Sequence, residues 1–386
     1  MRQCVTCKGK GMCGLPHCPI TARFLRAKTI TPIEEYMGAT PSVFVGSYGY
    51  PAIALHPLMT QDHDHPPDWM TAHHSISDIV GIRAETIRGK HAGQERYTLA
   101  MQEVALSIKP LDIETRFSKP VSWDVSFGTV ITPVGRSGEI ARCEVIDNAT
   151  VPRIVDKVTS DTDLNATGAC QELVQGKTDV YHISQLLSAG LLGREKRRRL
   201  VPTRWSITAT DDIVAKQLRD TISRYSPINS CQVCFAKEYG NAIAMIFIPG
   251  AWEYEMVEAW EIGSLWGGEQ EYIISDREGK KKQGYSPIAG GYYAARIAAL
   301  EYLAQIRRCA QVIVVRYTSR DYWAPLGVWV VREVSRKAIT QKPYLCDTPD
   351  EAVSMVTALL QRTSWHQYIT SIEKAKLQTR LSDFWE

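Results

Sequence analysis

Strand-like and helix-like stretches alternate through the second half of this 386-residue chain, and that alternation limits the folds open to it. Short apolar stretches predict strands, and longer stretches with an apolar face predict helices. The expected strands are 205–208, 230–236, 242–248, 254–262, 311–318 and 327–334, and the expected helices are 210–224, 292–309, 349–360 and 366–377. The pattern predicts an α+β fold with a mixed, largely antiparallel sheet and packed helices.

The first half gives weaker signals of the same kind. Two short strands are expected between Ser42 and Leu55, a further strand at 151–158, and helices at 75–88, 163–175 and 183–191. Residues 238–241 suit a hairpin turn between two of the later strands. A chain of this length has room for two or three domains.

Composition excludes several classes of protein. Hydrophobic residues make up 44% of the chain and charged residues 23%, as in ordinary folded domains. The formal net charge is only +3, so any contact with nucleic acid has to come from local basic patches. No apolar run approaches the roughly 20 residues of a membrane span, and the N-terminus has no signal-peptide core. We therefore expect a cytoplasmic protein that contacts no membrane.

Four of the ten cysteines lie within the first 18 residues, as Cys4, Cys7, Cys13 and Cys18. Four thiolates at such short spacing can surround one zinc ion tetrahedrally, and the glycines among them let the backbone curl around the metal. His17 is an alternative to one of the sulfurs, and an iron–sulfur cluster is an alternative to zinc. The cluster predicts a small N-terminal zinc-binding module whose metal is structural, because four protein ligands leave no open coordination position.

Cys231 and Cys234 form a second close pair that lacks a partner pair nearby. The segment around them alternates like a strand, which would place the two sulfurs on opposite faces of a sheet. We expect ordinary core or surface thiols here.

A basic segment lies near the middle of the chain, and Glu195 is its one acidic residue. Its cationic residues are Arg194, Lys196, Arg197, Arg198, Arg199 and Arg204. Such a segment can grip phosphates without reading base sequence, and a solvated surface loop is the alternative. We predict contact with DNA phosphates.

The segment 252–261 mixes aromatic and acidic residues. In a strand, one face would be apolar and the other acidic. We expect packing on one face and a solvated acidic face on the other, with a base-stacking platform as the alternative.

The C-terminal residues follow the spacing Gln-x-x-Leu-x-x-aromatic-aromatic, from Gln378 through Leu381 to Phe384 and Trp385. Wound as one tight turn, this spacing puts the three apolar side chains on one side, where they can fill a pocket on a partner. Docking of the aromatic pair on the chain's own core is the alternative. The pattern resembles the sliding-clamp-binding peptide of DNA replication and repair proteins, and this resemblance implies a partner of the PCNA type, a ring-shaped homotrimer that encircles DNA.

The chain resembles the archaeal Nre family of DNA repair proteins over its full length. The residues that carry the resemblance are the four N-terminal cysteines, the block from Arg199 to Ala209, and the tail from Gln378 to Trp385. The resemblance implies a role in the repair of DNA damage and binding to the sliding clamp through the C-terminal peptide. It transfers no catalytic chemistry.

These observations give four expected regions and three hypotheses. The regions are a zinc-binding module at 1–22, α+β domains at 23–200 and 201–376, and a flexible clamp-binding tail at 377–386. The first hypothesis is a DNA repair factor recruited to DNA by the clamp. The others are an enzyme that acts on nucleotides or damaged DNA ends, and a non-catalytic adaptor. A deep polar pocket beside Arg204 would favour the enzyme, and a continuous positive groove with aromatic residues would favour DNA binding. A flat surface with only the tail motif would favour the adaptor.

No catalytic residue is assigned, because the sequence contains no nucleophile elbow, dinucleotide fingerprint or zinc-hydrolase motif.

Overall fold

The computed structural model of the chain describes residues 32–61, 64–91, 93–121, 135–264, 267, 269–278, 282 and 284–370. These residues form two compact units. We call residues 32–214 with 324–326 the N-terminal unit, and residues 215–323 with 327–370 the C-terminal unit. The predicted boundary at residue 200 lies in the loop before helix α9 (Thr203–Ile222), and the two units divide within that helix.

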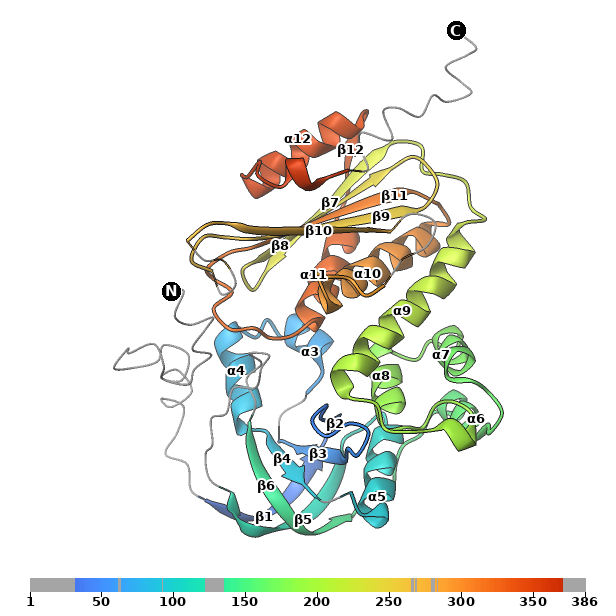
Figure 1. Cartoon of the computed structure of the whole chain (residues 1–386), viewed down its shortest axis with the longest axis vertical. Helices are drawn as coiled ribbons and strands as arrows, with labels where there is room; N and C mark the ends of the chain where they lie inside the picture. Colours follow the sequence, from blue (N-terminus) through green and yellow to red (C-terminus); the bar gives the residue numbers. More distant parts are fainter. Residues whose placement is uncertain are drawn as a thin grey trace. The chain divides into compact units, whose positions relative to one another are not determined.

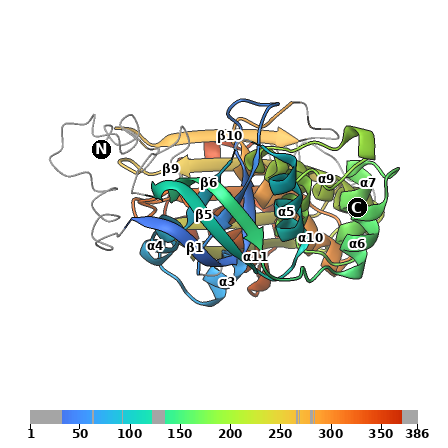
Figure 2. The same ribbon diagram turned by 90° about the horizontal axis from the view of Figure 1, so that it is seen from below.

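A six-stranded sheet forms the base of the N-terminal unit, with its strands in the order β1-β5-β6-β4-β3-β2. The strands are β1 (Ile33–Thr40), β2 (Ser42–Val45), β3 (Leu55–Met59), β4 (Ile87–Lys90), β5 (Leu111–Val121) and β6 (Arg136–Val145). Of the neighbouring pairs, β4 with β6 is parallel and the others are antiparallel. Figure 2 shows β1, β5 and β6 side by side in this sheet.

The helices of the N-terminal unit are α3 (Pro66–Thr71), α4 (Ile76–Glu85), α5 (Glu95–Leu106), α6 (Arg153–Ser160), α7 (Ala166–Gln175) and α8 (Val180–Ser188). Strict alternation along β5 buries Leu111, Ile113 and Phe117 against Met101 and Val104 of α5. A second cluster packs α6, α7 and α8 together. The unit therefore has one core under its sheet and another among its helices.

The C-terminal unit is built on a second six-stranded sheet, with its strands in the order β10-β9-β11-β8-β7-β12. The strands are β7 (Cys231–Glu238), β8 (Asn241–Ile248), β9 (Glu253–Trp260), β10 (Tyr272–Glu278), β11 (Gln311–Thr318) and β12 (Tyr344–Cys346). Here β9 and β11 are parallel and the other neighbours are antiparallel. Both sheets thus confirm the predicted α+β fold with a mixed, largely antiparallel strand arrangement.

Helices cover both faces of this second sheet (Figure 1). α10 (Gly290–Ile306) and α11 (Trp329–Thr340) lie on one face, and α12 (Pro349–Leu360) lies on the other. Every residue of β8 and β11 is buried, because both faces of these central strands are covered. The core beneath α12 includes Val257, Ile313 and Val356.

The expectation of a solvated acidic face in the segment 252–261 is wrong. Glu258 is 7% exposed, and its Oε2 atom lies 2.6 Å from Nη1 of Arg316 on β11. The guanidinium also donates to Oδ1 of Asn241, from Nε at 3.0 Å and Nη2 at 2.7 Å, and lies over the ring of Trp260. Glu258 is buried because helices cover both faces of the sheet. A charge that is buried in this way needs a partner, and Arg316 supplies it.

Two predictions that depend only on residues close together in the sequence are confirmed. The hairpin is confirmed, since β7 and β8 pair in antiparallel register up to Glu238 and Asn241. Both thiols of the central pair are buried, with Cys231 in the core beneath α12 and Cys234 near Tyr302 of α10. The expected placement on opposite faces is confirmed.

Two strand predictions failed inside long helices. The predicted strand 205–208 and the predicted start of a helix at residue 210 both lie within α9, where Ser206, Thr210 and Val214 are buried at helical spacing. Aromatic and β-branched residues favour a strand locally, but burial every four residues favours a helix over the longer segment. The predicted strand 327–334 is likewise mostly the start of α11, which buries Val330, Val334 and Ala338.

Two other expectations also differ from the structure. The predicted strand 151–158 is mostly α6, whose buried residues Val155 and Val158 are three apart. Of the helix expected at 366–377, the structure describes residues 366–370, which contain a 3₁₀ turn, η2 (His366–Tyr368). Among the residues that the structure describes, no helix combines the length and apolar character needed to cross a membrane.

Candidate nucleic-acid interface

The basic segment forms the loop between α8 and α9 of the N-terminal unit. Its middle is a 3₁₀ turn, η1 (Glu195–Arg197), and its end is fixed by the backbone amide of Val201, which donates to the carbonyl of Ser188 at 3.0 Å. Gly190 begins the loop with a φ of +71°, and a Cβ atom there would lie 2.9 Å from the carbonyl carbon of Arg199. The loop therefore folds back on its own beginning, which only glycine permits at that point.

One arginine of the segment is used to hold the loop together. Arg198 donates from Nε to the carbonyl of Gly193 at 2.8 Å, from Nη1 to Thr159 at 2.8 Å, and from Nη2 to Asp161 at 2.7 Å. These carbonyls include ones at the end of α6, where the helix leaves acceptors without intrahelical donors. The geometry gives Arg198 a structural role, and the predicted phosphate contact would have to come from its neighbours.

The other cations of the segment are at the surface. Lys196, Arg197, Arg199 and Arg204 are all exposed, and within the described residues none of them forms an ion pair or a side-chain hydrogen bond. Arg194 is exposed as well and has one long hydrogen bond, from Nε to the carbonyl of Asp163 at 3.3 Å. These side chains are therefore available to phosphate groups.

Two aromatic side chains extend this basic surface, and sequence reasoning missed both. Tyr50 and Trp205 are 41% and 43% exposed, and their ring centroids are 5.0 Å apart in an edge-to-face arrangement. Trp205 follows Arg204 directly in the first turn of α9, and no acidic residue occupies that turn. Tyr48, in the same turn of chain as Tyr50, is fully exposed.

A hydrogen-bonded threonine brings the tyrosine turn to the helix. The hydroxyl of Thr203 accepts from the backbone amide of Val45 at 2.9 Å and lies 3.2 Å from the hydroxyl of Ser188. Val45 ends β2, and the turn that carries Tyr50 follows it, with Gly49 at a φ of +81°. The aromatic pair therefore has a fixed position at the start of α9, where Arg204 directly precedes Trp205.

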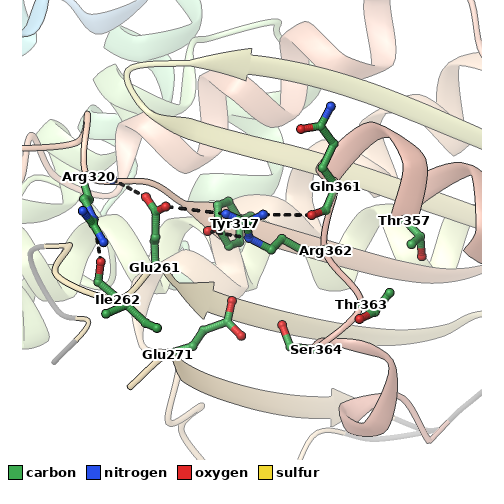
Figure 3. A pocket seen from close by; sticks show the side chains of 10 residues that line it. All are labelled: Glu261, Ile262, Glu271, Tyr317, Arg320, Thr357, Gln361, Arg362, Thr363 and Ser364. Carbon is green, nitrogen blue, oxygen red and sulfur yellow. Dashed lines mark hydrogen bonds and ion pairs between the residues drawn. The ribbon is translucent and has the colours of Figure 1, made fainter. Parts of the chain in front are cut away.

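A cavity in the C-terminal unit has a volume of about 590 Å³ (Figure 3). It lies at the ends of β9 and β11 and at the end of α12. Its lining residues are Glu261, Ile262, Glu271, Tyr317, Arg320, Thr357, Gln361, Arg362, Thr363 and Ser364.

The charges of this pocket largely satisfy one another. Arg362 donates from Nε to the hydroxyl of Tyr317 at 3.1 Å, and its Nη2 atom lies 3.6 Å from the carboxylate of Glu261. The same carboxylate accepts from the backbone amide of Arg320 at 3.0 Å. Burial raises the pKa of Tyr317, so its phenol stays protonated at neutral pH. A second, smaller pocket of about 110 Å³ in the N-terminal unit is also lined by charged side chains.

Arg204 lines neither of these pockets. Neither of these two pockets is therefore the deep polar pocket beside Arg204 that would favour an enzyme. The N-terminal unit presents exposed cations and an exposed aromatic pair, which are two of the features expected of a DNA-binding surface.

The other predicted site residues lie outside the described part of the chain. They are Cys4, Cys7, Cys13 and Cys18 of the expected metal site, and Gln378, Leu381, Phe384 and Trp385 of the expected clamp-binding peptide. Between residues 32 and 370, as far as they are described, no group of three or more His, Cys, Asp or Glu side chains is arranged to hold a metal ion.

Comparison with known proteins gives matches along nearly the whole chain. Residues 12–267 match the family model described as archaeal Nre, N-terminal, and residues 277–384 match the one described as archaeal Nre, C-terminal. No solved structure matches the chain.

Relatives named DNA repair proteins come from Archaeoglobus fulgidus and Haloferax volcanii. DNA repair protein NreA of Archaeoglobus fulgidus is 33% identical over 394 residues, which cover 99% of this chain and 98% of that protein. DNA repair protein NreB of the same organism is 34% identical over 97% of this chain and 98% of its own length. DNA repair protein NreA of Haloferax volcanii is 34% identical over 92% of this chain and 90% of its own length.

Proposed function

Because this chain belongs to the archaeal Nre family, we propose that it is a DNA repair factor that the sliding clamp brings to DNA. The observation that carries the repair role is the similarity along nearly the full length to relatives named DNA repair proteins, at 33–34% identity. Similarity over both family regions makes it reasonable to extend the role of the whole relatives to the whole chain.

The clamp is proposed as the partner on the strength of the C-terminal peptide. Gln378, Leu381, Phe384 and Trp385 have the spacing of a clamp-binding plug, and they lie within nine residues of the chain end. Three apolar side chains on one side of a tight turn can fill one pocket of a PCNA-type homotrimer, with the glutamine as a polar anchor. A clamp that encircles DNA then raises the local concentration of the protein on its substrate.

The DNA contact is proposed for the exposed cations Arg194, Lys196, Arg197, Arg199 and Arg204. Their charges would neutralise backbone phosphates and release counterions, so binding should weaken steeply as salt rises. An enzyme acting on nucleotides or DNA ends remains the second candidate, but no observation near Arg204 favours it.

We further propose a structural zinc ion for the N-terminal module. The donor set fits that metal, since Cys4, Cys7, Cys13 and Cys18 supply four soft thiolates and no carboxylate. The metal would stabilise a segment that is too short and polar to build a core of its own.

Replacing Cys4 and Cys7 with serine is expected to release about one equivalent of zinc per chain, because two of the four ligands are lost. Elemental analysis of the purified full-length protein measures the change. The control is Cys309→Ser, at a buried thiol that hydrogen-bonds backbone groups, and this variant should keep its zinc. Full zinc content in the Cys4→Ser/Cys7→Ser variant would count against these ligands. Iron in the wild-type protein would indicate an iron–sulfur cluster at this site in place of zinc.

The repair role can be tested in cells that depend on this protein. A chain that ends at Lys376 lacks the clamp-binding tail, and cells that carry only this version should be as sensitive to DNA-damaging agents as cells without the protein. The full chain should restore survival. Equal survival with the full and shortened chains would reject recruitment through the tail, and sensitivity unaffected by loss of the whole protein would reject the repair role.

A further inference from the structure

The aromatic pair on the N-terminal unit is an unusual surface feature. Tryptophan side chains are mostly buried in folded proteins, yet Trp205 is 43% exposed and Tyr50, in contact with it, is 41% exposed. Exposed aromatic groups that lie together generally mark a place where something binds. Each ring is held by the other in an edge-to-face arrangement at an interplanar angle of 64°.

The backbone around the pair is fixed as well. Thr203 at the start of α9 accepts a hydrogen bond from Val45 at the end of β2, so the tyrosine turn and the helix are tied together. The amide of Ala52 donates to the carbonyl of Gly49 at 2.9 Å, which closes the turn that carries Tyr50. A partner that stacks on these rings would therefore meet a surface that is already in place, and less ordering entropy is lost on binding.

The charge around the pair selects the chemistry of that partner. Arg204 is the residue before Trp205, and Arg199 lies six residues before Trp205 in the same segment, both exposed. Apart from Glu195, the segment from 194 to 205 has no acidic residue. Aromatic faces next to exposed arginines suit a ligand that has both flat rings and negative charge.

We propose that this surface binds single-stranded DNA, with unpaired bases stacked on Trp205 and Tyr50 and the adjacent phosphates held by Arg204 and Arg199. The inference rests on the proposed function for its choice of DNA. In a duplex the faces of the bases are covered by their neighbours and only the backbone is offered to a flat protein surface. Aromatic side chains at a protein surface add affinity mainly when bases are unpaired, and stacking is then worth about 1–3 kcal/mol per base.

The test is a titration of full-length protein with a fluorescently labelled oligothymidylate of about 20 nucleotides, compared with a duplex of the same length. The wild type is expected to bind the single strand more tightly. Trp205→Ala should weaken single-strand binding at least about fivefold, and Trp205→Phe should keep most of the affinity because a stacking face remains. Arg204→Gln should weaken binding of both DNA forms and lower the salt dependence by about one phosphate contact.

The control is Tyr272→Ala. Tyr272 is an exposed aromatic of the C-terminal unit, 49% exposed, and it follows Glu269 and Glu271 in the sequence, so it matches the proposed site in type but not in charge. This variant should bind single-stranded DNA like the wild type.

Three outcomes would overturn the inference. They are unchanged single-strand affinity in Trp205→Ala, tighter binding of the duplex than of the single strand, and tighter binding of an oligouridylate than of the DNA. Titration of the same variants with the clamp separates this failure from failure of the proposed function. If Trp205→Ala keeps both its clamp binding and its single-strand affinity, only the proposed stacking site is rejected. A wild type that binds neither the clamp nor any DNA would reject the proposed function itself.

Discussion

Replacing both Phe384 and Trp385 with alanine should lower the affinity for the sliding clamp at least about 100-fold. Buried aromatic anchors at interfaces typically contribute 2 kcal/mol or more each, and about 1.4 kcal/mol corresponds to a factor of ten in affinity. Since the two side chains are proposed to fill one pocket, their losses will not be strictly additive. Calorimetric titration of the purified clamp with the full-length variant measures the effect.

The matched control for this experiment is Thr379→Ala, at a position of the tail where the spacing requires no particular side chain. Its clamp affinity should equal that of the wild type. The circular dichroism and thermal unfolding of the double-alanine variant should also be unchanged, because the plug is proposed to lie outside the folded units. A double variant that binds the clamp normally, or that unfolds at a clearly lower temperature, would mean that the aromatic pair serves the chain's own fold.

Arg316→Met should destabilise the C-terminal unit by about 3–5 kcal/mol. The methionine keeps much of the length of the side chain but removes the charge, which leaves the carboxylate of Glu258 buried without its partner at 2.6 Å. Two hydrogen bonds to Asn241 are lost in the same step. Urea unfolding followed by tryptophan fluorescence measures the change in the free energy of unfolding.

A surface ion pair provides the comparison for the buried one. Arg142 lies 2.8 Å from Glu144 with both side chains largely exposed, so Arg142→Met should leave the unfolding midpoint close to that of the wild type. The double variant Glu258→Gln/Arg316→Met should recover part of the loss, because no uncompensated buried charge remains. A loss below about 1 kcal/mol in Arg316→Met would show that water or another group replaces the arginine.

The sequence predicted those parts of the fold that depend on neighbouring residues. Short apolar segments around the turn at Glu238–Asn241 gave the hairpin, and alternation gave the two faces of the strand with Cys231 and Cys234. It failed where local preference and long-range packing disagree. The aromatic and β-branched residues at the start of α9 and α11 favour strands over four residues, but their burial repeats at helical spacing over twelve or more residues.

The candidate site divides in the same way. The basic segment could be found from sequence because its residues are adjacent, but the structure was needed to show that Arg198 holds the loop while Arg204 faces solvent. The pairing of Tyr50 with Trp205 joins residues 155 positions apart in the chain, and no local pattern signals it. Glu258 was misjudged for the same reason, since its partner Arg316 lies on a strand that is adjacent only in the folded sheet.

We propose that a peptide at the chain end places this protein on DNA through the clamp. The most direct test of this proposal measures how much of the protein stays on closed circular DNA that has been loaded with the clamp. The DNA is washed at a salt concentration that removes protein held by phosphate contacts alone. We predict that the full chain stays on the circle while the clamp is loaded and leaves when the DNA is cut to linear form, from which a ring slides off. Equal retention with and without the loaded clamp would contradict the account.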